Sequence, residues 1–176
     1  MGDTFITVIA IGLVAVLMFI FPVITMADRV DTVSQTDIDT LVSELVNEIQ
    51  TTGKLTSERY SKFIEELTST GNTYDINLEF KILDENPGKK RLQADSDKIG
   101  ENVYYSVFTT QIEEKLVTDT VYQLKEGDIV MVSVKNTNLT LAQQMKSFLY
   151  SAVGADIYTL QASHSGLVTA TGNKAE

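Results

Sequence analysis

The fold is decided by residues 5–26, which read FITVIAIGLVAVLMFIFPVITM and contain no charged side chain. As an α-helix this run is roughly 33 Å long, which matches the hydrocarbon thickness of a bilayer. The residues before it contain no Lys or Arg, and Thr25-Met26-Ala27 is a poor cleavage site, so a secretory signal peptide is the weaker interpretation. We therefore expect residues 1–26 to form a retained transmembrane anchor helix, which Pro22 should bend.

The anchor should continue into an amphipathic helix. Apolar residues recur beyond it at spacings of three and four, as they do along one face of a helix. Apart from Pro22, no Gly or Pro separates the amphipathic segment from the apolar run, so the sequence predicts one helix from Phe5 to Thr51 that ends at Gly53. Its periodic apolar residues, which we expect to pack on a sheet, are Val30, Val33, Ile38, Leu41, Val42, Leu45, Val46 and Ile49.

Residues 27–176 are expected to form a small head, of which residues 27–52 are the helical continuation of the anchor. Alternating apolar and polar residues predict a strand over Tyr74–Ile82, and β-branched residues predict a central strand over Ile129–Val134. Strands with helices on one side are typical of an antiparallel sheet. The expected fold class is therefore α+β, with a long N-terminal transmembrane-to-amphipathic helix followed by a head with an antiparallel sheet.

The other segments complete this head. Val103–Thr110 reads equally well as a strand or as the entry to a helix. The remaining expected elements are a helix from the N-cap Thr56 to Gly71-Asn72, a helix over Thr140–Val153, and strands over Ala155–Ser163 and Leu167–Thr171 around a turn at Ser165-Gly166.

The amino-acid composition excludes several classes of functional site. The chain has no Cys and a single His, so disulfides and zinc–thiolate sites are excluded and imidazole chemistry is disfavoured. Its 24 acidic and 14 basic residues give a net charge of −10, which repels nucleic acid. We therefore expect no nucleic-acid partner and no cofactor.

Local motifs give no catalytic or metal site either. His164 has no nucleophile held at a strand-to-helix elbow beside it. Asp95 and Asp97 have the residue type of a calcium loop in the wrong register, and Lys89-Lys90-Arg91 is typical of a solvated loop. We expect a protein that is not an enzyme and has no small-molecule substrate.

The order of these features resembles that of type IV pilins and pseudopilins, and more specifically the TadE-like membrane-anchored proteins of Gram-positive bacteria. The residues that carry the resemblance are Phe5–Met26, Ala27–Ile49, Thr51-Thr52-Gly53-Lys54-Leu55, Ser69-Thr70-Gly71-Asn72-Thr73-Tyr74 and Gly127-Asp128-Ile129-Val130. It implies a structural subunit that assembles through its N-terminal helix into an extracellular filament. The assembly residues it implies are Phe5, Ile6, Val8, Ile9, Ile11, Leu13, Val14, Val16, Leu17, Phe19, Ile20, Phe21 and Pro22.

The N-terminus departs from the pilin pattern. Pilin precursors are usually cut after a small residue preceded by basic residues, and the mature fifth residue is usually Glu. A cut after Gly2 would here place Thr7 fifth, and no basic residue precedes Gly2. Asp3 is the nearest acid; it either pairs with the N-terminal amine of a neighbouring subunit or is exposed among lipid headgroups.

The resemblance also sets the expected partners and location. Partners would be other copies of the chain, the membrane, and secretion or pilus assembly machinery. The protein would be a single-pass membrane protein, part of an extracellular filament, or both, with its head outside the cytoplasm. Two alternatives remain: a bitopic accessory component of a secretion or conjugation complex, and a cell-surface binding or sensor domain.

Overall fold

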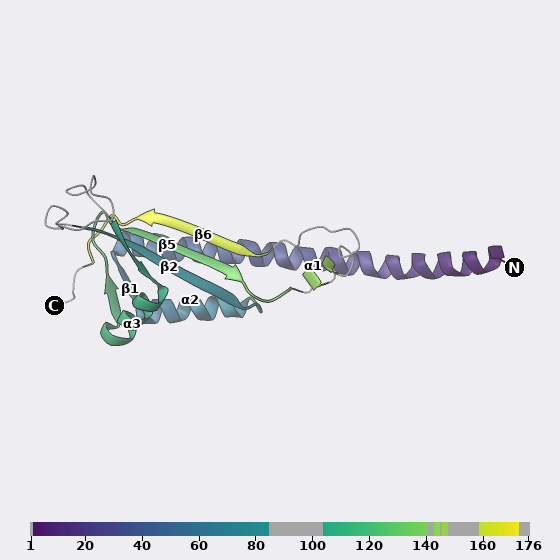
Figure 1. Cartoon of the computed structure of the whole chain (residues 1–176), viewed down its shortest axis with the longest axis horizontal. Helices are drawn as coiled ribbons and strands as arrows, with labels where there is room; N and C mark the ends of the chain where they lie inside the picture. The colour runs from purple at the N-terminus through teal and green to yellow at the C-terminus, as the bar shows by residue number, and fades with distance from the viewer. Residues whose placement is uncertain (1, 85–103, 141–142, 145, 148–158, 173–176) are drawn as a thin grey trace.

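The computed structural model describes residues 2–84, 104–140, 143, 144, 146, 147 and 159–172. It confirms the expected α+β class: a single N-terminal helix, α1 (Gly2–Thr52), is followed by a small head with antiparallel sheets. Figure 1 shows that the N-terminal half of α1 projects from the head as a free rod, whereas the C-terminal half lies along the sheet.

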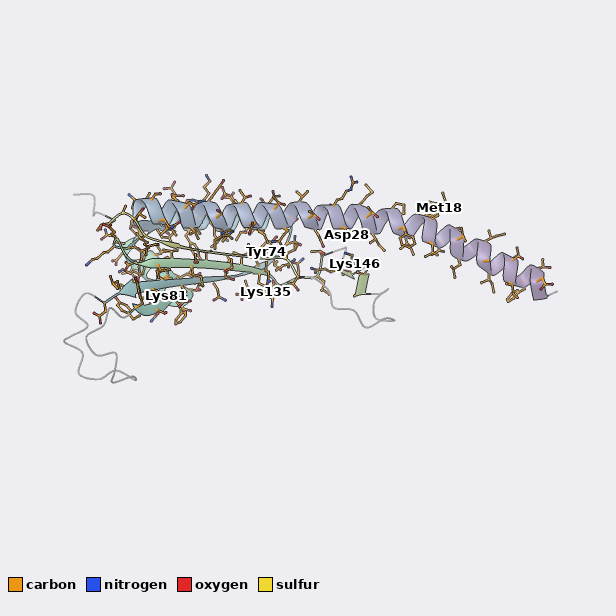
Figure 2. All side chains as sticks on the ribbon, turned by 90° about the horizontal axis from the view of Figure 1, so that it is seen from above. Met18, Asp28, Tyr74, Lys81, Lys135 and Lys146 are labelled. Atoms are coloured by element: carbon orange, nitrogen blue, oxygen red, sulfur yellow. The ribbon has the colours of Figure 1, made fainter. Side chains whose placement is uncertain are left out.

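The apolar half of α1 is bent. Pro22 lies inside the helix and has no N–H to donate to the carbonyl of Met18, four residues earlier. Figure 2 shows the helix changing direction close to Met18. The expected effect of Pro22 is therefore found at the turn of helix that its missing hydrogen bond would have closed.

The head is built of two sheets and two further helices. The elements after α1 are β1 (Lys54–Thr56), α2 (Ser57–Ser69), β2 (Tyr74–Leu83), β3 (Tyr104–Phe108), α3 (Thr109–Asp119), β4 (Val121–Gln123), β5 (Ile129–Asn136) and β6 (Gln161–Leu167). Four strands form an antiparallel sheet in the order β3-β2-β5-β6, and β1 pairs with β4. In Figure 1, α1 and α2 lie side by side behind this sheet, with α1 along β5 and β6.

The core lies between the helix layer and the sheet. Alternate residues of β2 and β5, among them Phe80 and Val132, are fully buried, as the period of two requires. The helix layer meets them with Leu45 of α1 and Phe63 of α2, neither of which is exposed. The strands expected over Tyr74–Ile82 and Ile129–Val134 are thus confirmed as the centre of the sheet.

The two expected boundaries of the helix pair are confirmed. Gly53 follows α1 with a φ of +66°, and a Cβ there would lie 2.2 Å from the carbonyl oxygen of Ala170, so only glycine fits. Thr56 caps α2, because its hydroxyl accepts a hydrogen bond of 3.2 Å from the backbone N–H of Arg59.

Two expectations for the strands need correction, and two short strands were not expected. No turn occurs at Ser165-Gly166, because β6 runs straight through both residues and pairs with β5. The expected strand over Leu167–Thr171 contributes only Leu167, the last residue of β6. The short strands β1 and β4 were not expected, since three residues are too few to show a period.

Two further segments are settled only in part. The ambiguous stretch Val103–Thr110 holds both expected elements, because β3 ends at Phe108 and α3 begins at Thr109. Gln143, Gln144, Lys146 and Ser147 are helical as expected. Of the strand predicted over Ala155–Ser163, residues 161–163 are the start of β6, and residues 155–158 lie outside the described residues. The rest of the helix predicted over Thr140–Val153 and residues 89–91, 95 and 97 also lie outside them.

Candidate assembly surface

The apolar half of α1 is exposed along its length. No residue in its most apolar stretch is buried against the head. By its length and composition, α1 could cross a membrane. Phe5 is 69% exposed, Val14 62% and Phe19 76%. Apart from the half-buried Ile20, the residues to which the resemblance assigned assembly are all exposed. A surface this apolar requires a cover of lipid or protein.

The first turn of α1 contains Asp3, the acid nearest to the N-terminus. Asp3 is exposed in the first turn of α1, where a carboxylate interacts favourably with the helix dipole. Thr7, the residue in fifth place after a cut at Gly2, donates its hydroxyl to the carbonyl of Asp3 at 2.7 Å. Thr7 therefore acts within its own helix, and the acid of this region is Asp3.

The head holds the C-terminal half of α1 by a buried face. Ile38, Val42 and Leu45 have no exposed surface, and Ile49 is 1% exposed. Glu48 on the neighbouring flank accepts a hydrogen bond of 2.6 Å from Nε of Arg59, which ties α1 to α2. The free half of the helix is thus continuous with a part that is packed into the head.

Side chains of α1 also hold the edge strand β6. The amide of Gln35 donates to the carbonyl of Gln161 at 2.8 Å and accepts from its N–H at 3.2 Å. Gln50 donates to the carbonyl of Leu167 at 3.0 Å. These contacts occupy backbone groups that an edge strand would otherwise present to another chain.

Gly166 shows how closely α1 approaches β6. A Cβ at this position would lie 2.1 Å from the side-chain amide of Gln50. This glycine, at which the sequence predicts a turn, is therefore a site of close approach between a strand and a helix. A turn and a close approach share the same sequence signal, which explains the wrong expectation.

His164 joins the same contact between helix and strand. Its Nε2 lies 3.0 Å from Oδ1 of Asp39 on α1. Its neighbours Ser163 and Ser165 alternate to the opposite face of β6, so neither hydroxyl stands beside the ring. Among the described residues, no group of three or more His, Asp or Glu could hold a metal ion.

The base of the head, where α1 leaves it, is a polar cluster. Asp28 forms an ion pair with Lys146, and the two lie together in Figure 2. Asp31 accepts a hydrogen bond of 2.7 Å from the hydroxyl of Thr140. Thr140 and Gln143 each accept a hydrogen bond from the other's backbone N–H, as in a capping box. The segment after β5 is therefore fastened to α1 just above the apolar half.

Two buried phenols lie in the head. The hydroxyl of Tyr60 donates to Oε1 of Glu113 at 2.7 Å, joining α2 to α3. Burial raises the pKa of Tyr60, and the hydrogen bond to Glu113 and its negative charge raise it further. Burial likewise raises the pKa of Tyr122, with smaller effects of Tyr105 and Asp128. Both hydroxyls stay neutral in the folded head.

The role of one buried acid, Asp128, does not follow from the sequence pattern. Asp128 is 2% exposed, and its carboxylate accepts hydrogen bonds from the N–H groups of Leu83 and Lys125. The sequence shows the turn signal at residues 125–128 but not this role of Asp128.

Two apolar residues of α1 differ from the sequence prediction. Val30 and Val33, expected on the packed face, are 63% and 59% exposed. Val33 lies on another side of α1 from the packed face, which follows Ser34, Ile38 and Leu45. Val30, four residues before the buried Ser34, lies next to that face and is nevertheless exposed.

No protein-family model, curated protein or solved structure matches this chain. Its function is therefore inferred from its own residues and geometry.

Proposed function

We propose that this chain is a pilin-like structural subunit that assembles through the apolar half of α1 into an extracellular filament. One observation supports the proposal above the others. A single unbroken helix is apolar on every side over its first half and packed into a polar, acidic head over its second half. A helix that is apolar all round is stable only when it is surrounded, by lipid or by other helices.

Other copies of the same helix provide that surrounding in a filament. When one patch of a subunit repeatedly contacts a different patch of the next, the contact does not close on itself and an open helical array grows. The projecting rod in Figure 1 is separated from the head, so rods can gather in a core while heads cover the outside. The head is attached to the C-terminal half of the same helix by the buried face of α1 and by the ion pair between Glu48 and Arg59. The position of each rod in the core therefore determines where its head lies.

Before assembly, the same half of α1 would be the membrane span. Its length fits a bilayer core, and the polar cluster at Asp28 and Lys146 follows it directly. The head would then lie outside the cytoplasm, and pilus assembly machinery would withdraw the rod from lipid. In this role the chain is structural and needs neither cofactor nor substrate.

A charge at mid-span tests the proposal. Val14→Lys places a cation in the rod; in a bilayer such a residue costs roughly 2.5–3.5 kcal/mol on insertion scales, with partial escape by snorkelling. In a filament core every subunit carries this charge, and water is absent. Val14→Leu is the matched control, because it keeps the position apolar.

The measurements are filament counts by electron microscopy and membrane fractionation, with the chain expressed alongside the assembly proteins of its host. The proposal expects abundant filaments for wild type and Val14→Leu, and none for Val14→Lys, while all three fractionate with membranes. A wild type that stays in the membrane without forming filaments would instead identify a bitopic accessory component.

A further inference from the structure

One flank of α1 stays apolar beyond the end of the expected span. It consists of Val23, Met26, Val30 and Val33, which are 44%, 69%, 63% and 59% exposed, and we call it the apolar flank. Their spacing of three, four and three places them on one line of the helix. Val30 and Val33 come after Asp28 and Arg29, the first charged residues past the span, so apolar surface and charge occupy the same height on α1.

The opposite side of α1 is polar at this height. Successive residues turn about 100° around a helix, so Asp28 lies roughly opposite both valines, and Asp31 lies roughly opposite Val33 and about 100° from Val30. Asp28 pairs with Lys146, and Asp31 accepts a hydrogen bond from Thr140. If the lipid–water boundary were perpendicular to the helix axis, either Asp28 and Asp31 would lie in lipid or Val30 and Val33 would lie in water. If the boundary is inclined to the axis, the valines can lie in lipid while the carboxylates stay in water.

The position of α2 favours lipid over a second helix as the cover of the apolar flank. The ion pair of Arg59 with Glu48 places the start of α2 beside the upper end of α1. From Arg59 to Ser69, α2 runs about 15 Å back along α1 toward the N-terminal half of that helix. The end of α2 is therefore close to the level of Ile38 on α1. A straight helix from another copy, packed in register along the flank, would therefore run into the end of α2 just above Val33. Acyl chains meet no such obstacle.

We infer that in the membrane-anchored form α1 leans over, so that the apolar flank lies in the lipid while Asp28 and Asp31 remain in water. This inference rests on the membrane span in the proposed function. Val33 lies five residues past Asp28, about 7.5 Å along the axis; across a helix about 11 Å wide, this offset gives an incline of roughly 35°. Transmembrane helices tilt by about 0–40°.

Arg29 fits the same arrangement. It is exposed and lies beside Val33 on the helix surface, at the margin of the apolar flank. In a leaning helix its stem lies along the lipid and its guanidinium reaches the headgroup phosphates. The head would consequently rest near the bilayer on its α2 side, with the polar cluster at Lys146 turned away from the lipid.

The chain has no Cys, so single cysteines can carry a nitroxide label without background. The test compares Val30→Cys and Val33→Cys with Thr32→Cys and Thr36→Cys, which are exposed at similar heights on other sides of α1. The full chain is reconstituted in phosphatidylcholine vesicles. Collision of each label with oxygen, which concentrates in lipid, and with a water-soluble nickel chelate is measured by power saturation.

The expected result is an oxygen-to-nickel ratio several-fold higher at residues 30 and 33 than at residues 32 and 36. Equal ratios at all four sites would overturn the inference, because the flank would then be in water. Labels at 30 and 33 that are shielded from both reagents and broadened by spin–spin contact would overturn it in favour of a second copy. Val14→Cys separates the two claims: access of nickel to this label would refute the membrane span itself.

Discussion

Replacing Leu45 by Ala should destabilise the head far more than an equal change on the free side of the same helix. Leu45 has no exposed surface and packs between the helix layer and the sheet. Removing a buried leucine side chain costs about 2–5 kcal/mol, according to how far the cavity collapses. Val33→Ala is the control, since Val33 is 59% exposed and substitutions at such positions change stability by about 0.5 kcal/mol or less.

The assay is urea unfolding of the full chain in a non-ionic detergent, followed by circular dichroism. With a denaturant slope of about 1–3 kcal/mol per molar, a loss of about 3 kcal/mol lowers the midpoint by roughly 1–3 M. Leu45→Asp should abolish cooperative unfolding, because an unpaired carboxylate in the core costs several kcal/mol. Equal midpoints for Leu45→Ala and Val33→Ala would refute the packing of α1 on the sheet as a source of stability.

Three further results are expected. Deleting residues 1–26 should release the head from the membrane fraction into the soluble fraction, and a truncated chain that still sediments with membranes would contradict the span. Gly166→Ala should push the end of the Gln50 side chain aside and break its hydrogen bond to the carbonyl of Leu167, destabilising the head by about 0.5–1.5 kcal/mol; in a Gln50→Ala background, where this hydrogen bond is already absent, the same change should cost less in thermal unfolding. Because folding raises the pKa of Tyr60, the unfolded chain binds fewer protons above about pH 10, so stability should fall as pH rises past this value; Tyr60→Phe should make the fall shallower in pH-dependent urea unfolding, and an unchanged slope would contradict the role of this phenol.

The long helix and the central strands could be predicted because their patterns extend over many residues. The apolar run in residues 5–26 and the alternation in Tyr74–Ile82 each repeat one period several times, so a single ambiguous residue does not matter. The short strands β1 and β4 offer no such repetition. They form because the chain leaves α1 at Gly53 and is brought back beside β4 by tertiary packing.

The surfaces of the candidate site were predictable only in part. The apolar residues of the rod follow from composition, and their exposure follows from the lack of head residues beside them. Periodicity alone groups Val30 and Val33 with Ile38, although both valines are exposed in the structure. Val33 lies on another side of the helix, and the exposure of Val30, next to the packed face, depends on where the head ends along α1. The role of Gly166 depends on the Gln50 side chain, which lies far away in sequence.

The hydrogen bonds from Gln35 and Gln50 of α1 to β6 bear on the order in which the protein is synthesised and folds. These contacts join residues 126 and 117 positions apart, so the last strand of the sheet is made long after the helix that holds it. At a synthesis rate of about 5–20 residues per second, the interval is on the order of ten seconds. During this time α1 is complete while the sheet lacks its fourth strand. If α1 inserts as proposed, the nascent chain meets the membrane first and completes its head afterwards, tethered at the bilayer surface.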